Sequence, residues 1–207
     1  MSYQAFSGEP PRAINKRKAF FFDMDGVLLD SMPNHVIAWQ QTLAHYGIPF
    51  TARDCYVNEG RTSRDVITLL ANRHHVPVSD NQLEEIYQAK TSAYRAMGGG
   101  KAMKNMDKVL QLLAQHHAAI WVVTGGGQKD LYEQLEGFYP GVFCRANFIT
   151  AYDVAHGKPD PEPYLKAWER SGLAKEQCCV VENAPLGIQA GKAAGLFTIG
   201  VNTGVLH

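Results

Sequence analysis

The sequence predicts an α/β protein with a doubly wound parallel sheet and an all-helical cap domain inserted after the first strand. Short apolar runs alternate with stretches of helical periodicity along most of the chain, which is typical of such a sheet. The alternation is interrupted once, over residues 33–97, where the pattern is almost wholly helical. The 207 residues suffice for one core and a small second module. We therefore expect residues 1–31 and 100–207 to form the α/β core and residues 32–99 to form the cap.

The core elements follow from the apolar pattern. Five runs have the composition of buried parallel strands: Ala19–Phe22, Ile120–Val123, Phe148–Thr150, Cys178–Val181 and Thr198–Val201. Helical periodicity lies between them at Asp107–His116, Gln128–Leu135, Pro161–Ser171 and Pro185–Ala194. Gly195 is placed to end the last of these helices. Strand and helix thus alternate through the second half of the chain.

The cap is predicted from three helical stretches with no strand between them. They are Pro33–His45, Arg64–His74 and Asn81–Ala96. Because ligands of such sheets bind beyond the carboxyl ends of the strands, an insert after the first strand would cover the ligand. Gly98–Gly100 is either a hinge for this cap or an ordinary surface loop.

Composition limits the class of partner. Lys and Arg total 20 and Asp and Glu total 20, so no net field attracts nucleic acid or an anionic membrane. The four cysteines have no CxxC spacing, and Met1–Lys18 lacks a signal-length apolar stretch. We expect a soluble cytoplasmic protein with reduced thiols and a small polar ligand. No long apolar seam marks the helices, so we expect a monomer.

Two carboxylates stand directly after the first predicted strand. Asp23 and Asp25 are two residues apart in the run Phe22-Asp23-Met24-Asp25-Gly26. In an extended segment both side chains point the same way, toward the ligand edge of the sheet. Acidic turns after strands are common, but the preceding strand and following glycine favour a functional pair.

Three further segments carry candidate groups at predicted strand ends and turns. Thr124 precedes three glycines, whose amides would suit phosphate oxygens or merely form a turn. Lys158 stands in a proline-bounded turn, where its ammonium could neutralise charge in a transition state or simply be solvated. Glu182 and Asn183 end the fourth strand with the oxygen ligands that Mg²⁺ prefers.

The order of these segments resembles the haloacid dehalogenase superfamily of phosphohydrolases, and most closely its β-phosphoglucomutase-like group. Asp23–Ser31 matches the first motif, Thr124 the second and Lys158 the third. Glu182-Asn183, with the glycines and alanines of 187–195, matches the fourth. The resemblance covers nearly the whole chain from Ala19 onward.

The resemblance implies a division of labour among the first two motifs. Asp23 would be the nucleophile that becomes an aspartyl phosphate and would also bind Mg²⁺. Asp25 would act as general acid and then base, with its backbone carbonyl on the metal. Thr124, Gly125 and Gly126 would hold the oxygens of the transferring phosphoryl group.

The other motifs complete the implied site. Lys158 would bridge Asp23 and the phosphoryl group, while Glu182 and Asn183 would complete the metal shell. This group usually has a second acid or a serine where Asn183 stands, so the motif here lacks one negative charge. An amide oxygen can still ligate Mg²⁺.

The cap contributes candidate substrate-binding residues. His35 and Trp39 lie four apart on one predicted helical face, a spacing that also suits simple core packing. By resemblance, His35 would assist proton transfer or closure, Arg64 would bind a distal phosphate and Lys90 would face the active site. Arg61 lies beside Arg64 in a segment similar to the specificity loop of the group, and an arginine fork suits phosphate.

Several functions stay open at this point. The first is a β-phosphoglucomutase-like transferase that acts on a small sugar phosphate, and the second is a phosphatase in which water attacks the aspartyl phosphate. The run Gly125–Gly127 replaces a small polar run of the mutase and weakens the first alternative. A dehalogenase needs neither a metal nor Asp25, and a phosphonatase usually lacks the second acid. A non-catalytic phosphometabolite-binding protein is the alternative from another class.

Overall fold

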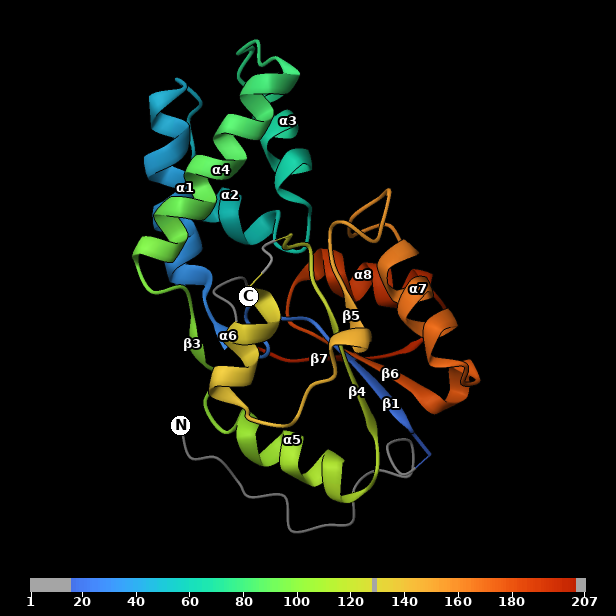
Figure 1. The fold of residues 1–207 in the computed structure, drawn as a ribbon. Helices are drawn as coiled ribbons and strands as arrows, with labels where there is room; N and C mark the ends of the chain where they lie inside the picture. Colours follow the sequence, from blue (N-terminus) through green and yellow to red (C-terminus); the bar gives the residue numbers. More distant parts are fainter. Residues whose placement is uncertain (1–15, 128–129, 204–207) are drawn as a thin grey trace.

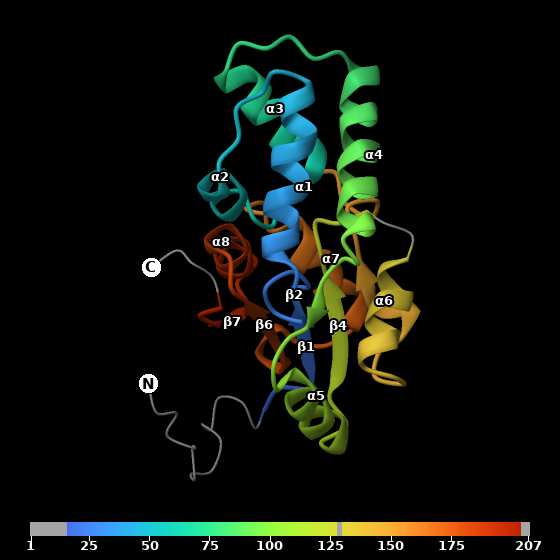
Figure 2. The same cartoon turned by 90° about the vertical axis from the view of Figure 1, so that its left-hand side faces the viewer.

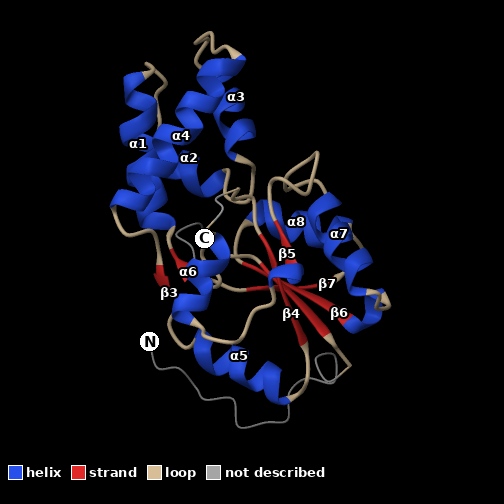
Figure 3. Ribbon diagram, in the orientation of Figure 1, coloured by secondary structure: helices blue, strands red, loops and turns tan. Residues whose placement is uncertain are grey.

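The structure of the chain, a computed structural model, describes residues 16–127 and 130–203. A five-stranded sheet has the order β5-β4-β1-β6-β7, and every neighbouring pair is parallel (Figures 1 and 3). The strands are β1 (Ala19–Phe22), β4 (Ala119–Val123), β5 (Phe148–Ile149), β6 (Cys178–Glu182) and β7 (Phe197–Gly200). The predicted α/β class and parallel sheet are confirmed.

Helices cover both faces of the sheet. They are α5 (Met106–Gln115), α6 (Leu131–Phe138), α7 (Glu162–Ser171) and α8 (Pro185–Ala193), with short 3₁₀ turns at Arg145–Asn147 and Lys175–Gln177. Because successive strand side chains point to opposite faces, Phe20 and Phe22 pack in one apolar cluster with α5 and α6. Phe21 packs in a second cluster with α7 and α8. The sheet is therefore doubly wound.

The segment between β1 and α5 contains the helical cap. Its helices are α1 (Met32–His45), α2 (Ala52–Val57), α3 (Ser63–Arg73) and α4 (Asp80–Ala96). Figures 1 and 2 show them gathered at one end of the molecule, away from the helices that flank the sheet. They bury an apolar cluster of their own, which includes Trp39, Leu43 and Ile67. A separate core supports the proposed division of the chain at residues 32–99.

The helix α2 was not expected from the sequence. Thr51 accepts a hydrogen bond from the Asp54 amide at 3.2 Å, and the Asp54 carboxylate accepts one from the Thr51 amide at 2.9 Å. This reciprocal capping box was visible as Thr51-Ala52-Arg53-Asp54, a recognised helix start. The six-residue helix is too short for its apolar periodicity to be read.

Two crossings join the cap to the core. β2 (Leu29–Asp30) and β3 (Lys101–Ala102) pair antiparallel and hold these crossings side by side. Gly98 and Gly99 have φ values of +80° and +68°, which favour glycine. The β2–β3 pair is too short to be recognised from sequence periodicity.

Parts of the sequence predictions lie outside the described residues. These are residues 1–15 and 204–207 of the predicted core and the start of the predicted helix at Gln128. The described part of that helix begins at Leu131. Among the helices within 16–127 and 130–203, none combines the length and apolar character that a bilayer span requires.

Candidate active site

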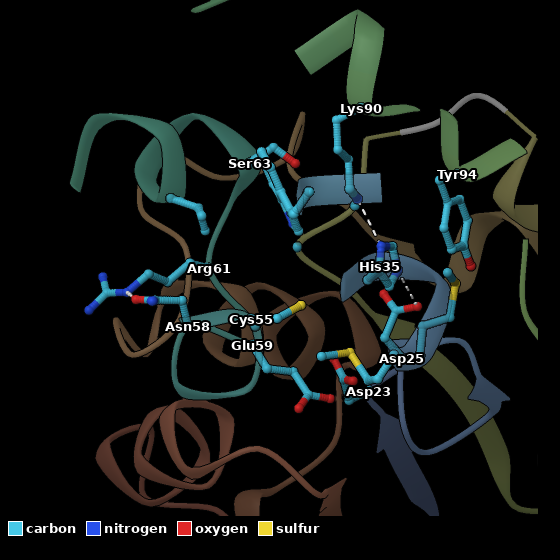
Figure 4. A pocket seen from close by; sticks show the side chains of 17 residues that line it. Asp23, Asp25, His35, Cys55, Asn58, Glu59, Arg61, Ser63, Lys90 and Tyr94 are labelled. Carbon is cyan, nitrogen blue, oxygen red and sulfur yellow. Dashed lines mark hydrogen bonds and ion pairs between the residues drawn. The ribbon is translucent and has the colours of Figure 1, made fainter. Parts of the chain in front are cut away.

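A cavity of about 70 Å³ lies between the end of β1 and the cap (Figure 4). Its lining comes from both domains and from stretches that are distant in sequence. The core supplies Asp23, Asp25, Gly125 and Gly126, and the cap supplies His35, Trp39, Glu59, Arg61, Lys90 and Tyr94 among others. The fold thus brings both predicted acids under the cap.

The Asp23 carboxylate is held by a buried ammonium group. Lys158, which is 1% exposed, donates through Nζ to Asp23 Oδ1 and to Glu182 Oε1, the latter at 2.7 Å. Its third hydrogen bond goes to the Val123 carbonyl at 3.0 Å. All three ammonium hydrogens are therefore used, so Lys158 links the ends of β1, β4 and β6. In this arrangement it bridges Asp23 to Glu182.

Glu182 is fully buried and accepts four hydrogen bonds. Oε1 accepts from Lys158 and from the Tyr164 hydroxyl at 2.9 Å. Oε2 accepts from the amides of Asn183 at 2.9 Å and Ala184 at 3.0 Å. A carboxylate offers about four lone-pair sites. Glu182 therefore holds Lys158 and the turn after β6, and it has no lone pair left for direct metal ligation.

Asp25 joins a different network that reaches into the cap. Its Oδ1 accepts from the Ser31 hydroxyl and lies 3.0 Å from His35 Nε2. Lys90 Nζ lies 2.8 Å from His35 Nδ1, and Figure 4 shows the ring between the two groups. An ammonium can only donate, so Nδ1 accepts and Nε2 carries the proton. The line Lys90–His35–Asp25 is therefore oriented for proton movement toward Asp25.

Burial and neighbouring charge move the pKa values of these groups in different directions. Burial, with repulsion from Glu182 and Asp25, raises the pKa of Asp23 to about 8, although Lys158 opposes the rise. Burial also acts to raise the pKa of Asp25, but His35 and Ser31 outweigh it and lower that pKa to about 2. Asp25 is thus held ionised, whereas burial shifts the pKa of Asp23 in the opposite direction.

Both basic groups of the cap have lowered pKa values. Burial lowers the pKa of His35, and the charge of Lys90 adds to that effect. Burial also lowers the pKa of Lys90 to about 8, against attraction by Asp25. The Lys90 ammonium lies 5.2 Å from the centre of the Trp39 ring and 5.3 Å from that of Tyr94. These aromatic faces partly replace water around the buried ammonium.

The glycine turn after β4 lies directly under a loop of the cap. The Gly126 amide donates to Thr124 Oγ1 at 3.0 Å, so the buried threonine closes this turn. A methyl group on Gly125 would meet the carbonyl oxygens of Arg61 at 2.7 Å and Gly60 at 2.9 Å. Glycine is therefore needed at this contact. The exposed-amide turn predicted from the sequence borders the cavity at Gly125 and Gly126, with Thr124 beneath it.

Asn183 contacts the cap. Its Nδ2 donates to Oε1 of Glu59 at 2.7 Å, and its Oδ1 is buried without a hydrogen-bond partner among the described residues. Glu59 is 8% exposed and lines the cavity. Burial raises the pKa of Glu59 to about 8, helped by the charges of Asp23, Asp25 and Glu182 and opposed by the Asn183 hydrogen bond.

The residues present fit a divalent cation of the Mg²⁺ type. Asp23 offers a buried carboxylate, and Asn183 Oδ1 is a buried acceptor that no described residue bonds. In the described part of the chain no three His, Cys, Asp or Glu side chains form a metal-binding group. A cation here would need the Asn183 amide and a main-chain carbonyl such as that of Asp25. Mg²⁺ accepts these oxygen ligands and retains several waters.

The predicted cap residues divide into two sets. One set lines the cavity and consists of His35, Trp39, Arg61 and Lys90. Arg61 stands at its border, where Nε donates to Asn58 Oδ1 at 3.2 Å. Arg64 does not line it: its side chain is 60% exposed and pairs with Asp80 at 3.3 Å. Its helix neighbours Ser63 and Val66 line the cavity, so Arg64 lies on a different face of α3, and its predicted phosphate contact has no support from this placement.

Several residues of the site were not among those chosen from the sequence. Tyr94 stacks on His35 with ring centres 4.1 Å apart, and the Lys90–Tyr94 spacing of four is the one available sequence signal. Ser31 stood within the first motif without a role. Tyr164 reaches the site only through tertiary packing, so no local pattern could have selected it. Glu59 begins the segment Glu59–Arg64 that resembles the specificity loop, but it was given no role there.

Comparisons of the sequence and of the structure with known proteins agree on one family. Residues 17–195 match the haloacid dehalogenase-like hydrolase family. Validoxylamine A 7'-phosphate phosphatase of Streptomyces hygroscopicus subsp. limoneus is 32% identical over 90% of this chain and 86% of its own. Hexitol phosphatase A of Escherichia coli (strain K12) is 29% identical over 89% of this chain and 83% of its own.

A solved structure from Bacteroides vulgatus, provisionally named a β-phosphoglucomutase, superposes with a TM-score of 0.88 at 40% identity. It covers 94% of this chain and 84% of its own. The match extends over core and cap together. The chain belongs to the haloacid dehalogenase-like hydrolases and is an enzyme of their phosphatase and phosphomutase group.

Proposed function

We propose that this enzyme hydrolyses the phosphate monoester of a small sugar or polyol through an aspartyl phosphate on Asp23. The observation that carries the proposal is the separation of two carboxylates in one cavity. Asp23 is held by Lys158, whereas Asp25 is held by His35 and Ser31. The names of the phosphatase relatives support the substrate class.

The proposed first step transfers the phosphoryl group to the enzyme. A carboxylate oxygen of Asp23 attacks phosphorus while the ester P–O bond breaks. Asp25 gives a proton to the departing oxygen. It receives that proton from the Nε2–H of His35 while the Lys90 ammonium protonates Nδ1 of the same ring, so His35 stays neutral and Lys90 is left as an amine; the proton that Asp25 later takes from water returns along the same line. Lys158 holds the Asp23 carboxylate in place and balances part of its charge.

The second step releases phosphate. Asp25, again ionised, takes a proton from water as the water oxygen attacks phosphorus and the Asp23–phosphorus bond breaks. The low pKa of Asp25 keeps this carboxylate ionised, so it is in the form that can accept the proton. The Gly125 and Gly126 turn borders the space that the phosphoryl oxygens would occupy.

Mg²⁺ is proposed as the cofactor, held by Asp23, the Asp25 carbonyl and Asn183 Oδ1. It would neutralise charge on the phosphoryl oxygens and help to keep Asp23 ionised. Glu182, whose lone pairs are filled, would support the cation by holding the main-chain N–H of Asn183 and the Lys158 ammonium.

The identity of the covalent residue can be tested by trapping. We expect Asp25→Asn to accumulate label on the protein after incubation with ³²P-labelled acetyl phosphate and Mg²⁺, because the acetate leaving group needs no proton from Asp25, whereas the attacking water loses its base. Asp23→Asn should carry no label and show no turnover. Label on the Asp23→Asn protein would contradict the assignment of the nucleophile.

A second candidate is the mutase reaction, in which the acceptor is a sugar hydroxyl. It is favoured by the Bacteroides vulgatus structure and by Arg61, a cap cation at the cavity border that could bind a second phosphate. Incubation with β-glucose 1-phosphate, Mg²⁺ and a trace of the bisphosphate separates the two reactions. We expect free phosphate; glucose 6-phosphate without free phosphate would instead establish the mutase.

A further inference from the structure

One hydrogen bond joins the cap to the turn that follows β6. Glu59 belongs to the segment between α2 and α3, whereas Asn183 directly follows Glu182 in the core. The two are 124 positions apart, and Nδ2 of Asn183 donates to Oε1 of Glu59 at 2.7 Å. The Glu59 side chain enters the cavity toward Asp23 (Figure 4).

The chemistry of an amide suits this position. Nδ2 can only donate and Oδ1 can only accept, so the bond to Glu59 fixes which end of the amide is which. The other end, Oδ1, is left buried and without a partner among the residues that the structure describes. A carboxylate at position 183 would instead place two acidic groups against each other. The Asn183 amide thus contacts the cap with one end and keeps an oxygen free with the other.

The loop that carries Glu59 is seated closely on the catalytic turns of the core. Gly60 lies against Lys158, whose Cδ is 3.0 Å from the position of an added Cβ. Gly125 lies under the carbonyls of Gly60 and Arg61, as described above. Glycine residues on both sides of this contact leave almost no space between cap and core. Loss of the Asn183–Glu59 hydrogen bond would therefore change how the whole loop packs against the core.

We propose that Glu59 is a positioning residue that orients the Asn183 amide for the divalent cation when the cap is closed. Closure brings the Glu59 carboxylate to Nδ2, and the bound amide then presents Oδ1 as a fixed ligand. Opening the cap breaks the bond and frees the amide to rotate. The cation site is thereby completed by the cap, although the cap supplies none of its ligands.

The orientation of Asn183 can be measured without any assay of activity. With MgCl₂ and inorganic phosphate present to close the cap, the Asn183 side-chain NH₂ should show slowed hydrogen exchange by NMR. Glu59→Ala should remove that protection, whereas Glu59→Gln should retain it, because the glutamine carbonyl still accepts. Equal protection in Glu59→Ala and the unaltered protein would overturn the proposal.

Coupling between the two residues can be tested with a double-mutant cycle. Loss of this buried hydrogen bond should raise exchange of the Arg61 amide by up to about tenfold in Glu59→Ala and in Asn183→Ala. The double variant should add no further increase, because one bond connects the pair. Glu84→Ala removes an exposed cap carboxylate on α4 and serves as the matched control, which should change nothing. Multiplying effects in the Glu59→Ala, Asn183→Ala protein would refute coupling.

Titration of the metal-free variants with MgCl₂ distinguishes position from charge. Loss of a residue that orients a ligand commonly weakens metal affinity by about 10- to 100-fold. We expect that loss in Glu59→Ala and only a few-fold change in Glu59→Gln. Equal weakening in both variants would show that the charge of Glu59 matters and its hydrogen bond does not. Circular dichroism of each variant establishes that it is folded.

The inference rests on the proposed function only for the identity of the cation site. Failure of the trapping experiment would remove the proposed chemistry but leave the exchange and titration results unaffected. Failure of the exchange experiments would remove the role of Glu59, while Asp23 could still be labelled. The two outcomes are therefore distinguishable.

Discussion

The position of the Glu182 side chain depends on Gly187, which lies five residues later, in α8. A methyl group on Gly187 would collide with the Glu182 carboxylate, whose two oxygens are fixed by four hydrogen bonds. The collision cannot be relieved by moving a flexible side-chain end, because Glu182 is fully buried. At the scale of single residues, Gly187 therefore sets the position of Glu182 and, through it, of Lys158.

We expect Gly187→Ala to destabilise the protein by about 1–3 kcal/mol, the usual cost of overpacking a buried position. The free energy of unfolding in urea measures this change. Gly137→Ala is the matched control, since Gly137 lies in helix α6 and no described atom beyond its neighbours and the backbone of its own helix comes within 4 Å of an added Cβ. There alanine should be neutral or stabilising by up to about 1 kcal/mol. Equal effects at the two positions would contradict the packing argument.

A second residue-scale prediction concerns pH. The positive charge of Lys90 contributes to the lowered pKa of His35, after burial itself. Lys90→Met removes that charge, so the pKa of His35 should rise, and the ring should protonate at higher pH than in the unaltered enzyme. NMR titration of the His35 ring protons reports the shift directly. An unchanged or lower pKa would show that Lys90 does not act on this ring.

Among the elements, the turn before α7 shows how a helix start positions a catalytic group. The carboxylate of Glu162, in the first turn of α7, accepts from the Ala155 amide at 3.0 Å and the His156 amide at 2.8 Å. These two residues stand shortly before Lys158 in the same turn. The hydrogen bond from the Ala155 amide, with further contributions from Lys166 and the His156 amide, lowers the pKa of Glu162 to about 2. The turn is thus tied to the helix by one ionised side chain.

The stability provided by Glu162 should depend on pH. Its pKa is lower in the folded than in the unfolded chain, so its contribution is present above the unfolded value, about 4.3, and is lost as pH falls toward 2. We expect Glu162→Gln to lower the free energy of unfolding at pH 7 by about 1 kcal/mol or less, given its solvent access. Urea unfolding at pH 7 and pH 3 checks this: the difference between variant and parent should shrink at pH 3.

For the whole molecule, the size of the cavity indicates that the cap must move. About 70 Å³ is far below the roughly 300–1,000 Å³ of typical ligand pockets, and the cap loop is seated on the core turns. A sugar phosphate could enter only if the cap swings away at the two crossings that β2 and β3 hold together. The structure thus corresponds to a closed arrangement.

This motion should be visible in solution. Without ligand, we expect a radius of gyration above that calculated from the closed structure, and addition of Mg²⁺ with inorganic phosphate should reduce it. Small-angle X-ray scattering measures both states. Identical values with and without ligand, both equal to the closed value, would mean that the substrate reaches Asp23 without cap movement.

Much of the fold was determined by local sequence pattern. Buried parallel strands appear as apolar runs, and helices show their own period, so both kinds of element were placed within a few residues. The helical interruption after β1 identified the cap for the same reason. The pattern could not reveal α2, β2 or β3, because six- and two-residue elements are shorter than the period needed to recognise them.

The candidate site was likewise predicted in part from local sequence pattern and decided in part by the tertiary structure. Asp23, Asp25 and Lys158 stand in turns after or beside apolar runs, so sequence alone could nominate them. Which groups touch was decided only in three dimensions: Lys158 joins Asp23 to Glu182, and Glu59 crosses from the cap to Asn183. The physical reason is range, since periodicity and turn chemistry act over a few residues, whereas hydrogen bonds between buried groups join segments that only packing brings together.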